Sequence, residues 1–283
     1  MKCEQCAKNS ISSQPSLCAD HFDSYIVDKV QNTIRTFSLL NKTDRVLVAA
    51  SGGKDSTAVM HLLERLGYSF DIVAIDEGIK GYRKGTLEDL RVNAKNNSLK
   101  ILSFKKEFDI SLDEHMKKEK QHACRVCGVF RRKLIAKAAN GYDVVVTGHN
   151  LDDEAQAIMM NVLKNNAALM NRLGPKTREQ EGFTVRIKPL YFVSEKEVLT
   201  YVVMHKLPVR FVECPYQQDS FRGEVGRWIN SLEKSSPGTK EKIVRKFLRT
   251  TLAVTEEPKQ TCSRCGAPSA RSVCRSCTLQ GRV

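Results

Sequence analysis

The sequence has no long apolar run, and this absence excludes several classes of protein. No window approaches the roughly 18 consecutive apolar residues that a membrane-spanning helix requires. The opening stretch, MKCEQCAKNS, also lacks the apolar centre of a secretory signal peptide. We therefore expect a cytoplasmic protein that does not bind a membrane. In that reducing compartment cysteines seldom form disulfides and more often bind metal or take part in catalysis.

Acidic residues are too few to balance the basic ones. The 283 residues include 46 Lys and Arg but only 32 Asp and Glu, which gives a formal charge of +14. This surplus is spread along the chain, so it predicts a polyanionic partner, although a basic protein without such a partner remains an alternative. Tryptophan is also scarce, since Trp228 is the only one, and we assign it to packing rather than to stacking on a base.

The cysteines fall into three sets. Near the start of the chain CxxC is followed by CxxH, and near the end CxxC is followed by a second CxxC; the two sets are Cys3, Cys6, Cys18 and His21, and Cys262, Cys265, Cys274 and Cys277. Four soft ligands at such spacing suit structural Zn²⁺, which a short segment with almost no core needs in order to fold. We predict one zinc finger from each set.

The third set is Cys124, Cys127 and Cys214. Three thiolates leave a tetrahedral site incomplete, and catalytic metal sites keep such a free position for substrate. Thiolate ligands alone also suit iron and sulfur, and a cubane cluster held by three cysteines leaves one iron exposed. A zinc site completed by His115 or His122 is the alternative.

Between the cysteine-rich ends, short apolar runs alternate with helical patterns. Runs rich in Val and Ile predict buried parallel strands at 45–50, 70–76, 99–104 and 143–149, and apolar residues recur at helical spacing in 54–66 and 125–139. We predict a doubly wound α/β fold with a mainly parallel, Rossmann-like sheet. Further on we expect an extended segment at 186–192, a helix at 195–206, a last strand at 209–213, a basic helical tail at 219–252 and a mobile loop at 164–181.

These patterns divide the chain into three domains. The zinc fingers occupy 1–24 and 257–283, and the α/β domain with the three central cysteines occupies 25–256. A chain of this length is long enough to bury a substantial core, so the central domain needs no metal for its stability.

Two polar segments follow predicted strands. SGGKDST, residues 51–57, lies between the first strand and a helix, where glycines allow backbone N–H groups to turn toward an anion and the helix dipole adds to the attraction. TGHNLDDEAQ, residues 147–156, ends the fourth strand at the sheet edge where open α/β sheets bind ligands. Asp152 and Asp153 in this segment could bind Mg²⁺, although acidic residues in a first helical turn also simply complement the dipole.

SGGKDS resembles the pyrophosphate-binding loop, or PP-loop, of the ATP pyrophosphatases, and GHNLDD resembles a second segment of that family. With the central cysteines and both predicted fingers, nearly the whole chain resembles the tRNA 2-thiouridine synthetases, the archaeal and eukaryotic cytoplasmic tRNA 2-thiolation family. This resemblance implies an enzyme that adenylates a tRNA uridine with ATP and replaces its 2-oxygen with sulfur. It also implies a [4Fe-4S] cluster on the three central cysteines, whose iron without a cysteine binds the sulfur.

The same resemblance implies the remaining site residues. It places ATP and Mg²⁺ against Ala50, Ser51, Gly52, Gly53, Lys54, Asp55, Ser56, Ile75, Gly148 and Asp153. Catalysis is then expected at Lys54, Asp55, Asp152 and the three central cysteines. Arg131 and Arg132 follow the cysteine pair on one predicted helix, where they could stabilise the phosphates or bind tRNA, although a solvated basic face is the alternative. The cofactors are then the cluster, two Zn²⁺, ATP and Mg²⁺.

Relatives of the resembled family act either at the wobble uridine or, in thermophiles, at a T-loop uridine. Asn-Asn pairs at 96–97 and 165–166 do not indicate avoidance of thermolabile residues, so we favour the wobble uridine. The expected partners are tRNA, a sulfur source that is either sulfide or a thiocarboxylated ubiquitin-like carrier protein, and a second copy in a homodimer. Thiolation of a cytidine, a persulfide relay without a cluster, and a non-catalytic zinc-finger RNA-binding protein remain alternatives.

Overall fold

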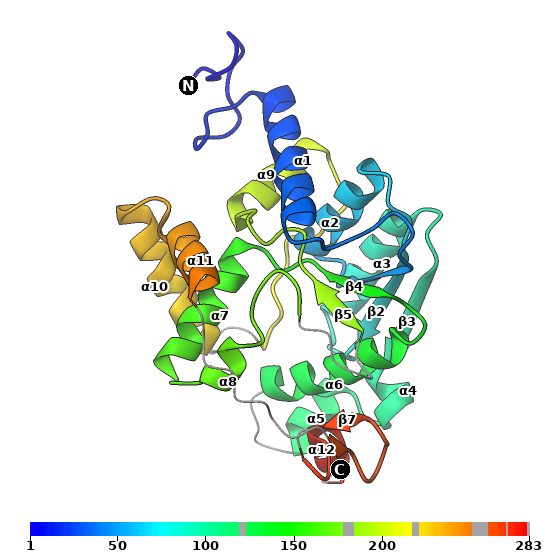
Figure 1. Cartoon of the computed structure of the whole chain (residues 1–283). Helices are drawn as coiled ribbons and strands as arrows, with labels where there is room; N and C mark the ends of the chain where they lie inside the picture. Colours follow the sequence, from blue (N-terminus) through cyan, green and yellow to red (C-terminus); the bar gives the residue numbers. More distant parts are fainter. Residues whose placement is uncertain (119–122, 178–183, 217–220, 251–259, 270, 282–283) are drawn as a thin grey trace.

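A five-stranded parallel sheet forms the centre of the computed structural model, which describes residues 1–118, 123–177, 184–216, 221–250, 260–269 and 271–281 (Figure 1). The strands are β1 (Val46–Ala49), β2 (Asp71–Asp76), β3 (Leu99–Ser103), β4 (Val144–Thr147) and β5 (Val185–Ile187). Their order in the sheet is β3-β2-β1-β4-β5, and every neighbouring pair is parallel. The chain therefore reverses its direction of travel across the sheet between β1 and β4, and the loops that follow these strands meet at one edge.

Side chains alternate between two cores along each strand. Val46 and Val48 of β1 pack in a cluster with α1 (Ala19–Thr36), α2 (Lys54–Arg65), α3 (Arg83–Ala94) and α9 (Glu195–Met204). Leu47 packs on the opposite face with α4 (Phe104–Phe108), α5 (Leu112–Lys118) and α6 (Ala123–Ala138). Helices on both faces explain why the strands are apolar at nearly every position, and the predicted doubly wound α/β fold is confirmed.

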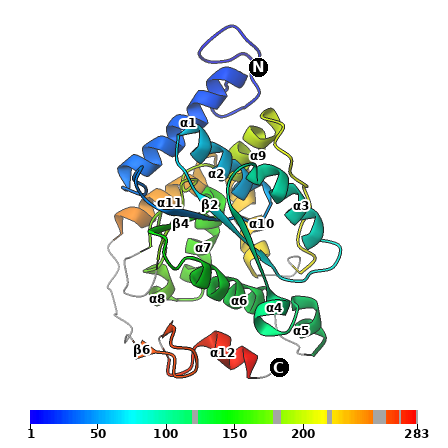
Figure 2. The same ribbon diagram turned by 90° about the vertical axis from the view of Figure 1, so that its right-hand side faces the viewer.

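The remaining elements extend the core on one side and at the chain end. α7 (Leu151–Leu163) packs against α8 (Ala167–Met170), α10 (Phe221–Ser235) and α11 (Thr239–Arg249). A short antiparallel pair, β6 (Gln260–Thr261) and β7 (Pro268–Ser269), precedes α12 (Arg275–Gln280), which packs on α6. The two cysteine-rich ends consequently lie at opposite ends of the molecule (Figure 2).

Several local predictions need correction. The predicted strand at 209–213 is wrong, because this segment pairs with no strand and leaves Phe211 and Val212 more than half exposed. It is instead held to α3, where Arg210 pairs with Glu88 and Asp89. The predicted extended segment at 186–192 is a strand only as far as Ile187.

The structure also bears on two further segments. The predicted loop at 164–181 contains α8, and residues 178–181 lie outside the described residues. α1 runs across the expected boundary after residue 24, so His21 and the core residues Phe22, Ile26 and Val30 share one helix. The boundary after residue 256 also lies outside the described residues. Within the described part of the chain, no helix is both long enough and apolar enough to cross a bilayer.

Candidate functional site

The loop after β1 forms an anion-binding cradle at the start of α2. The Ser56 hydroxyl accepts a hydrogen bond from the Ser51 N–H at 3.2 Å and donates one to the Gly53 carbonyl oxygen at 2.9 Å. Gly53 is the N-cap of α2, and no side chain caps the helix. The first N–H groups of α2 therefore have no partner within the helix and, with the dipole, can bind an anion.

Glycines allow the segments of the site to approach one another closely. Gly52 has φ of +79°, and a Cβ there would lie 2.0 Å from the carbonyl oxygen of Thr86 in α3. A Cβ on Gly148 would lie 2.9 Å from backbone atoms of Asp55 and Ser56. The loops after β1 and β4 are thus in direct contact, as their positions in the sheet require.

Asn150 joins the turn after β4 to the cradle. Its side chain donates to an Asp55 carboxylate oxygen at 2.9 Å and accepts the Asp153 N–H at 3.1 Å, while Asp153 accepts the Asn150 N–H in a capping box. Burial raises the pKa of Asp153, although the nearby Arg222 guanidinium, 3.0 Å away, partly offsets that effect. Asn150 therefore holds two carboxylates beside the cradle, that of Asp55 through its side-chain amide and that of Asp153 through its backbone N–H, which is a suitable arrangement for Mg²⁺.

The three central cysteines lie beyond the end of β2. Cys124 and Cys127 are one turn apart on α6, and Cys214 lies on the segment after α9. This segment is held in place by Tyr216, whose backbone oxygen accepts from Cys124 and whose hydroxyl donates to Asp113 at 2.8 Å. Burial, followed by the charge of Glu77 and the neighbouring cysteines, raises the pKa of Cys127 to about 12. Such thiols ionise readily only when a cation compensates their charge, as a metal centre does.

The spacing of these thiols argues against zinc. A zinc ion with Zn–S distances near 2.3 Å holds its sulfur ligands roughly 3.8 Å apart. Among the described residues, only the two terminal sets bring three or more His, Cys, Asp or Glu ligand atoms within 4.8 Å of one another, so neither the central cysteines nor a group containing His115 does so. His122 lies outside the described residues. An iron-sulfur cluster, in which each cysteine binds a different iron, does not require sulfur ligands that close together.

A buried chain of charges connects the cradle with the cysteines. Arg83 of α3 donates hydrogen bonds to the carbonyl oxygens of Ser51 and Ile75, and its Nε lies 2.9 Å from Glu77. The other carboxylate oxygen of Glu77 lies 3.4 Å from Nε of Arg131, which follows Cys127 by one helical turn. The side chains of Arg83 and Glu77 are only 4% and 6% exposed. Since a buried charge is stable only with its partners, this chain fixes α6 relative to the phosphate loop.

Comparison with known proteins identifies the family. The profile described as "PP-loop domain" matches residues 23–224. The tRNA-5-methyluridine(54) 2-sulfurtransferase of Pyrococcus horikoshii is 34% identical over 99% of this chain and 94% of its own length. Cytoplasmic tRNA 2-thiolation protein 1 of Danio rerio is 34% identical over 98% of this chain and 86% of its own length. The chain belongs to the PP-loop family of tRNA 2-thiolation proteins.

A solved structure agrees with this family. The U34-tRNA thiolase NcsA from Methanococcus maripaludis, determined with its [4Fe-4S] cluster, superposes with a TM-score of 0.85 at 33% identity, covering 100% of this chain and 96% of that one. Both the overall fold and the terminal cysteine-rich segments therefore belong to the compared region.

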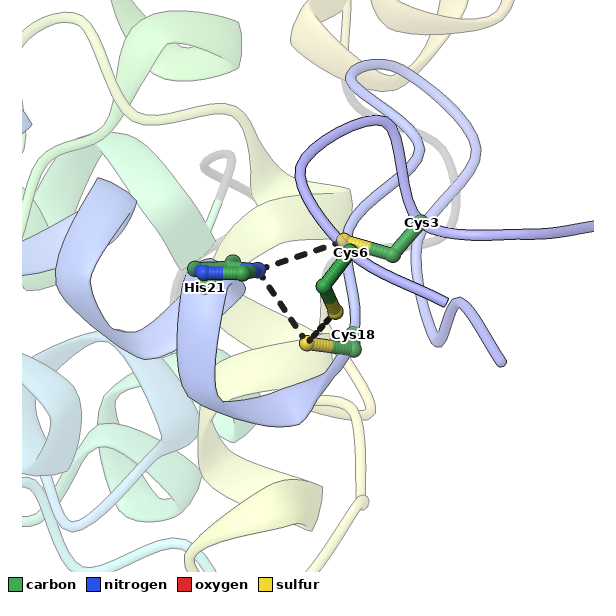
Figure 3. A group of neighbouring side chains, drawn as sticks. All are labelled: Cys3, Cys6, Cys18 and His21. Atoms are coloured by element: carbon green, nitrogen blue, oxygen red, sulfur yellow. Dashed lines mark hydrogen bonds between the residues drawn. The ribbon is translucent and has the colours of Figure 1, made fainter. Parts of the chain in front are cut away.

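This tRNA 2-thiolation family member carries the two terminal cysteine sets in metal-binding geometry. In the N-terminal set, Nδ1 of His21 lies 3.3 Å from Sγ of Cys3 and 3.4 Å from Sγ of Cys18, and Sγ of Cys6 lies 3.7 Å from that of Cys18 (Figure 3). These spacings match the edges of a tetrahedron around zinc. Burial opposes ionisation of Cys3, but hydrogen bonds from the backbone of Cys18 and Gln5 outweigh it and lower its pKa to about 6.

Two residues expected to act in catalysis have other surroundings. Asp152 is buried, accepts the Glu195 N–H at 2.9 Å and forms an ion pair with Lys240, so it joins α7 to α9 and α11. Arg132 lies near Arg186 and Arg275; burial and these charges lower its pKa. Neither contact involves the phosphate loop, whereas Arg131 lies beside Cys127. These contacts give Asp152 a role in joining helices, and its expected place among the catalytic groups stays a prediction.

The sequence reasoning missed the residues that connect the two parts of the site. Glu77, Arg83 and Asn150 all follow the carboxyl ends of strands, as the recognised motifs do. The stretch DEGIKGYR, which starts with Asp76 at the end of β2, was a usable signal, because charged residues at that edge point to a ligand site.

Replacing Asp152 with alanine should destabilise the protein without removing its nucleotide site. Loss of one partner of a buried ion pair lowers the free energy of unfolding by about 3 kcal/mol or more. Urea unfolding measures this change, and the ATP affinity of the folded variant should stay within about twofold of the original, since a twofold change is under about 0.5 kcal/mol. Glu241→Ala, which breaks an exposed pair on α11, is the control and should cost less than about 1 kcal/mol. A large loss of ATP affinity with unchanged stability would show instead that Asp152 acts in the nucleotide site.

Proposed function

We propose that the protein is an ATP-dependent tRNA 2-sulfurtransferase that thiolates the wobble uridine. The observation that carries this proposal is the direct connection between a phosphate-binding loop and three thiols, through Arg83, Glu77 and Arg131. An enzyme that must activate an oxygen with ATP and then replace it with sulfur needs these two sites next to each other.

The phosphate loop performs the activation step. N–H groups at the start of α2 and the Lys54 ammonium bind the phosphates, and Asp55 and Asp153 hold Mg²⁺. The 2-oxygen of the uridine attacks the α-phosphorus of ATP, and pyrophosphate leaves. Adenylation is needed because oxide is a poor leaving group, whereas AMP, which carries away the former uridine oxygen, is a good one.

The three-cysteine site serves the replacement step. A [4Fe-4S] cluster on Cys124, Cys127 and Cys214 supplies, when bound, an iron without a protein ligand at which sulfide is kept deprotonated. Arg131 stands between this site and the phosphate loop, where its positive charge can stabilise the AMP that departs. The terminal cysteine sets are proposed to bind structural zinc, and the sulfur donor and the homodimer stay predictions.

The similarity to known relatives does not decide which tRNA uridine is modified. Identity is 34% to the enzyme named for uridine 54 and 33% to the thiolase named for uridine 34. We therefore test transcripts with cytidine at position 34 or 54, using anaerobically reconstituted protein, ATP and sulfide, and detect 2-thiouridine by mass spectrometry of digested RNA. Thiolation should require uridine at position 34 only. If formation of 2-thiouridine requires uridine at position 54 instead, the modified nucleotide is the T-loop uridine.

Cys214→Ala and Asp55→Ala should fail at different steps. Loss of Cys214 removes a cluster ligand, so iron and thiolation should be lost while terminal zinc remains. Loss of Asp55 should spare iron but lower pyrophosphate release by on the order of a hundredfold, because phosphate charge is no longer balanced through Mg²⁺. Metal analysis and pyrophosphate assays separate the two. Full iron in the first variant, or unchanged pyrophosphate release in the second, contradicts these assignments.

Glu77→Gln should uncouple the two halves of the reaction. The amide keeps the shape of the side chain but loses the charge that holds Arg83 and Arg131. The phosphate loop and α6 are then no longer held in a fixed position relative to each other. We expect the ratio of thiolated uridine formed to pyrophosphate released to fall severalfold in protein that retains iron. Glu241→Gln, which alters an exposed pair with Arg245 on α11 away from both sites, is the control. An unchanged ratio in folded, iron-loaded Glu77→Gln protein would rule out this coupling.

A further inference from the structure

α10 has a buried side and an exposed side of unusual composition. Val225, Gly226 and Ile229 are buried, and the helix packs on α7. On the exposed side, the side chains of Phe221 and Trp228 are 37% and 47% exposed. They are seven residues apart, so they lie on one face of the helix roughly 10 Å from each other. The only tryptophan, which the sequence analysis assigned to packing, is thus about half exposed.

Basic side chains accompany these two rings. Arg227 and Lys234 are exposed on α10, and the Lys164 ammonium at the end of α7 lies 4.3 Å from the centre of the Phe221 ring. Of the two acidic residues of α10, Glu233 accepts backbone N–H groups at the start of α11, which leaves Glu224 as the exposed one. Aromatic faces next to cations are the composition that binds unstacked bases and their phosphates. At about 100° per residue, Arg227 and Lys234 lie roughly 120° around α10 from the two rings, with the exposed Glu224 between them. We call the exposed surface formed by Phe221, Arg227, Trp228 and Lys234 the α10 strip.

The α10 strip begins at the nucleotide site. Arg222, which follows Phe221 in sequence, contacts Asp153 in the first turn of α7 at 3.0 Å. From there α10 continues for 15 residues, a length of roughly 22 Å. An RNA whose target base enters beside the phosphate loop therefore has this surface next to the bases that flank the target.

We propose that the α10 strip binds unpaired bases of the tRNA loop that carries the target uridine. This inference rests on the proposed function and adds the surface on which the substrate lies. A second copy of the chain is a poorer occupant, because two faces of a protein with formal charge +14 repel each other when they carry exposed cations. RNA supplies both the opposite charge and the flat rings that Trp228 and Phe221 can stack on.

The single tryptophan allows a direct test. Because Trp228 is the only one in the chain, tryptophan fluorescence reports on the α10 strip alone. Quenching by acrylamide, a neutral quencher, is measured on the anaerobically purified holoprotein with and without saturating unmodified tRNA. Bound tRNA should lower the quenching constant by at least about twofold, since a base stacked on the indole excludes the quencher.

Substitutions in the α10 strip test how much its side chains contribute to tRNA affinity. Trp228→Ala should weaken tRNA binding roughly tenfold, as expected for one lost base–aromatic stack, whereas Trp228→Phe should retain most of the affinity. Arg227→Gln should reduce the salt dependence of binding by about one phosphate contact. The matched controls are Val203→Ala, an exposed apolar residue of α9, and Arg91→Gln, an exposed cation of α3; both should bind tRNA normally.

Each outcome has a distinct meaning. If the original protein binds and thiolates tRNA but acrylamide quenching and Trp228→Ala affinity are unchanged, the α10 strip is not the RNA surface while the proposed function stands. If Trp228 is already protected without RNA and becomes accessible on dilution, a second copy covers the strip and the inference is overturned. Failure of the original protein to bind tRNA at all would instead overturn the proposed function.

Discussion

The buried carboxylate of Glu77 is the interaction on which the rest of the site depends. It is held between Arg83, which fixes the backbone of the phosphate loop, and Arg131, which stands beside the central cysteines. Arg83 and Glu77 lie in the protein interior and tolerate little displacement, because each loses its compensation when it moves, whereas the Arg131 side chain is 42% exposed. The loop after β1, the loop after β2 and α6 are therefore linked by these three side chains, which place the two halves of the proposed reaction next to each other.

The same elements that build the core also position the chemistry. α6 buries Val126, Phe130 and Leu134 under the sheet, which fixes the direction in which Cys124 and Cys127 point. Cys214 comes from a segment without regular structure, and its position is set by the contacts of Arg210 with α3 and of Tyr216 with α5. A thiol on an irregular segment is thus placed as firmly as the thiols on the helix.

Local patterns predicted the strands, α2, α6 and α9, because buried strands and helical faces have short, repeating apolar signatures. They failed at 209–213, where Phe211 and Val212 look like strand residues but are exposed. α1 was not predicted, and its first turn holds His21 of the N-terminal metal set while Phe22, Ile26 and Val30 of the same helix are buried in the core. The Glu77 contacts and the exposed position of Trp228 depend on how distant segments pack, and no local pattern contains that information.

The central claim is that a metal cluster with one open iron faces the bound nucleotide. Anomalous diffraction at the iron edge, from anaerobic crystals with a non-hydrolysable ATP analogue, tests it most directly. We predict iron bound by Cys124, Cys127 and Cys214, with one iron free of protein ligands on the side of the phosphate loop and close enough for a single uridine to reach both. A fourth side chain on that iron, or a separation that no base can bridge, would contradict the account.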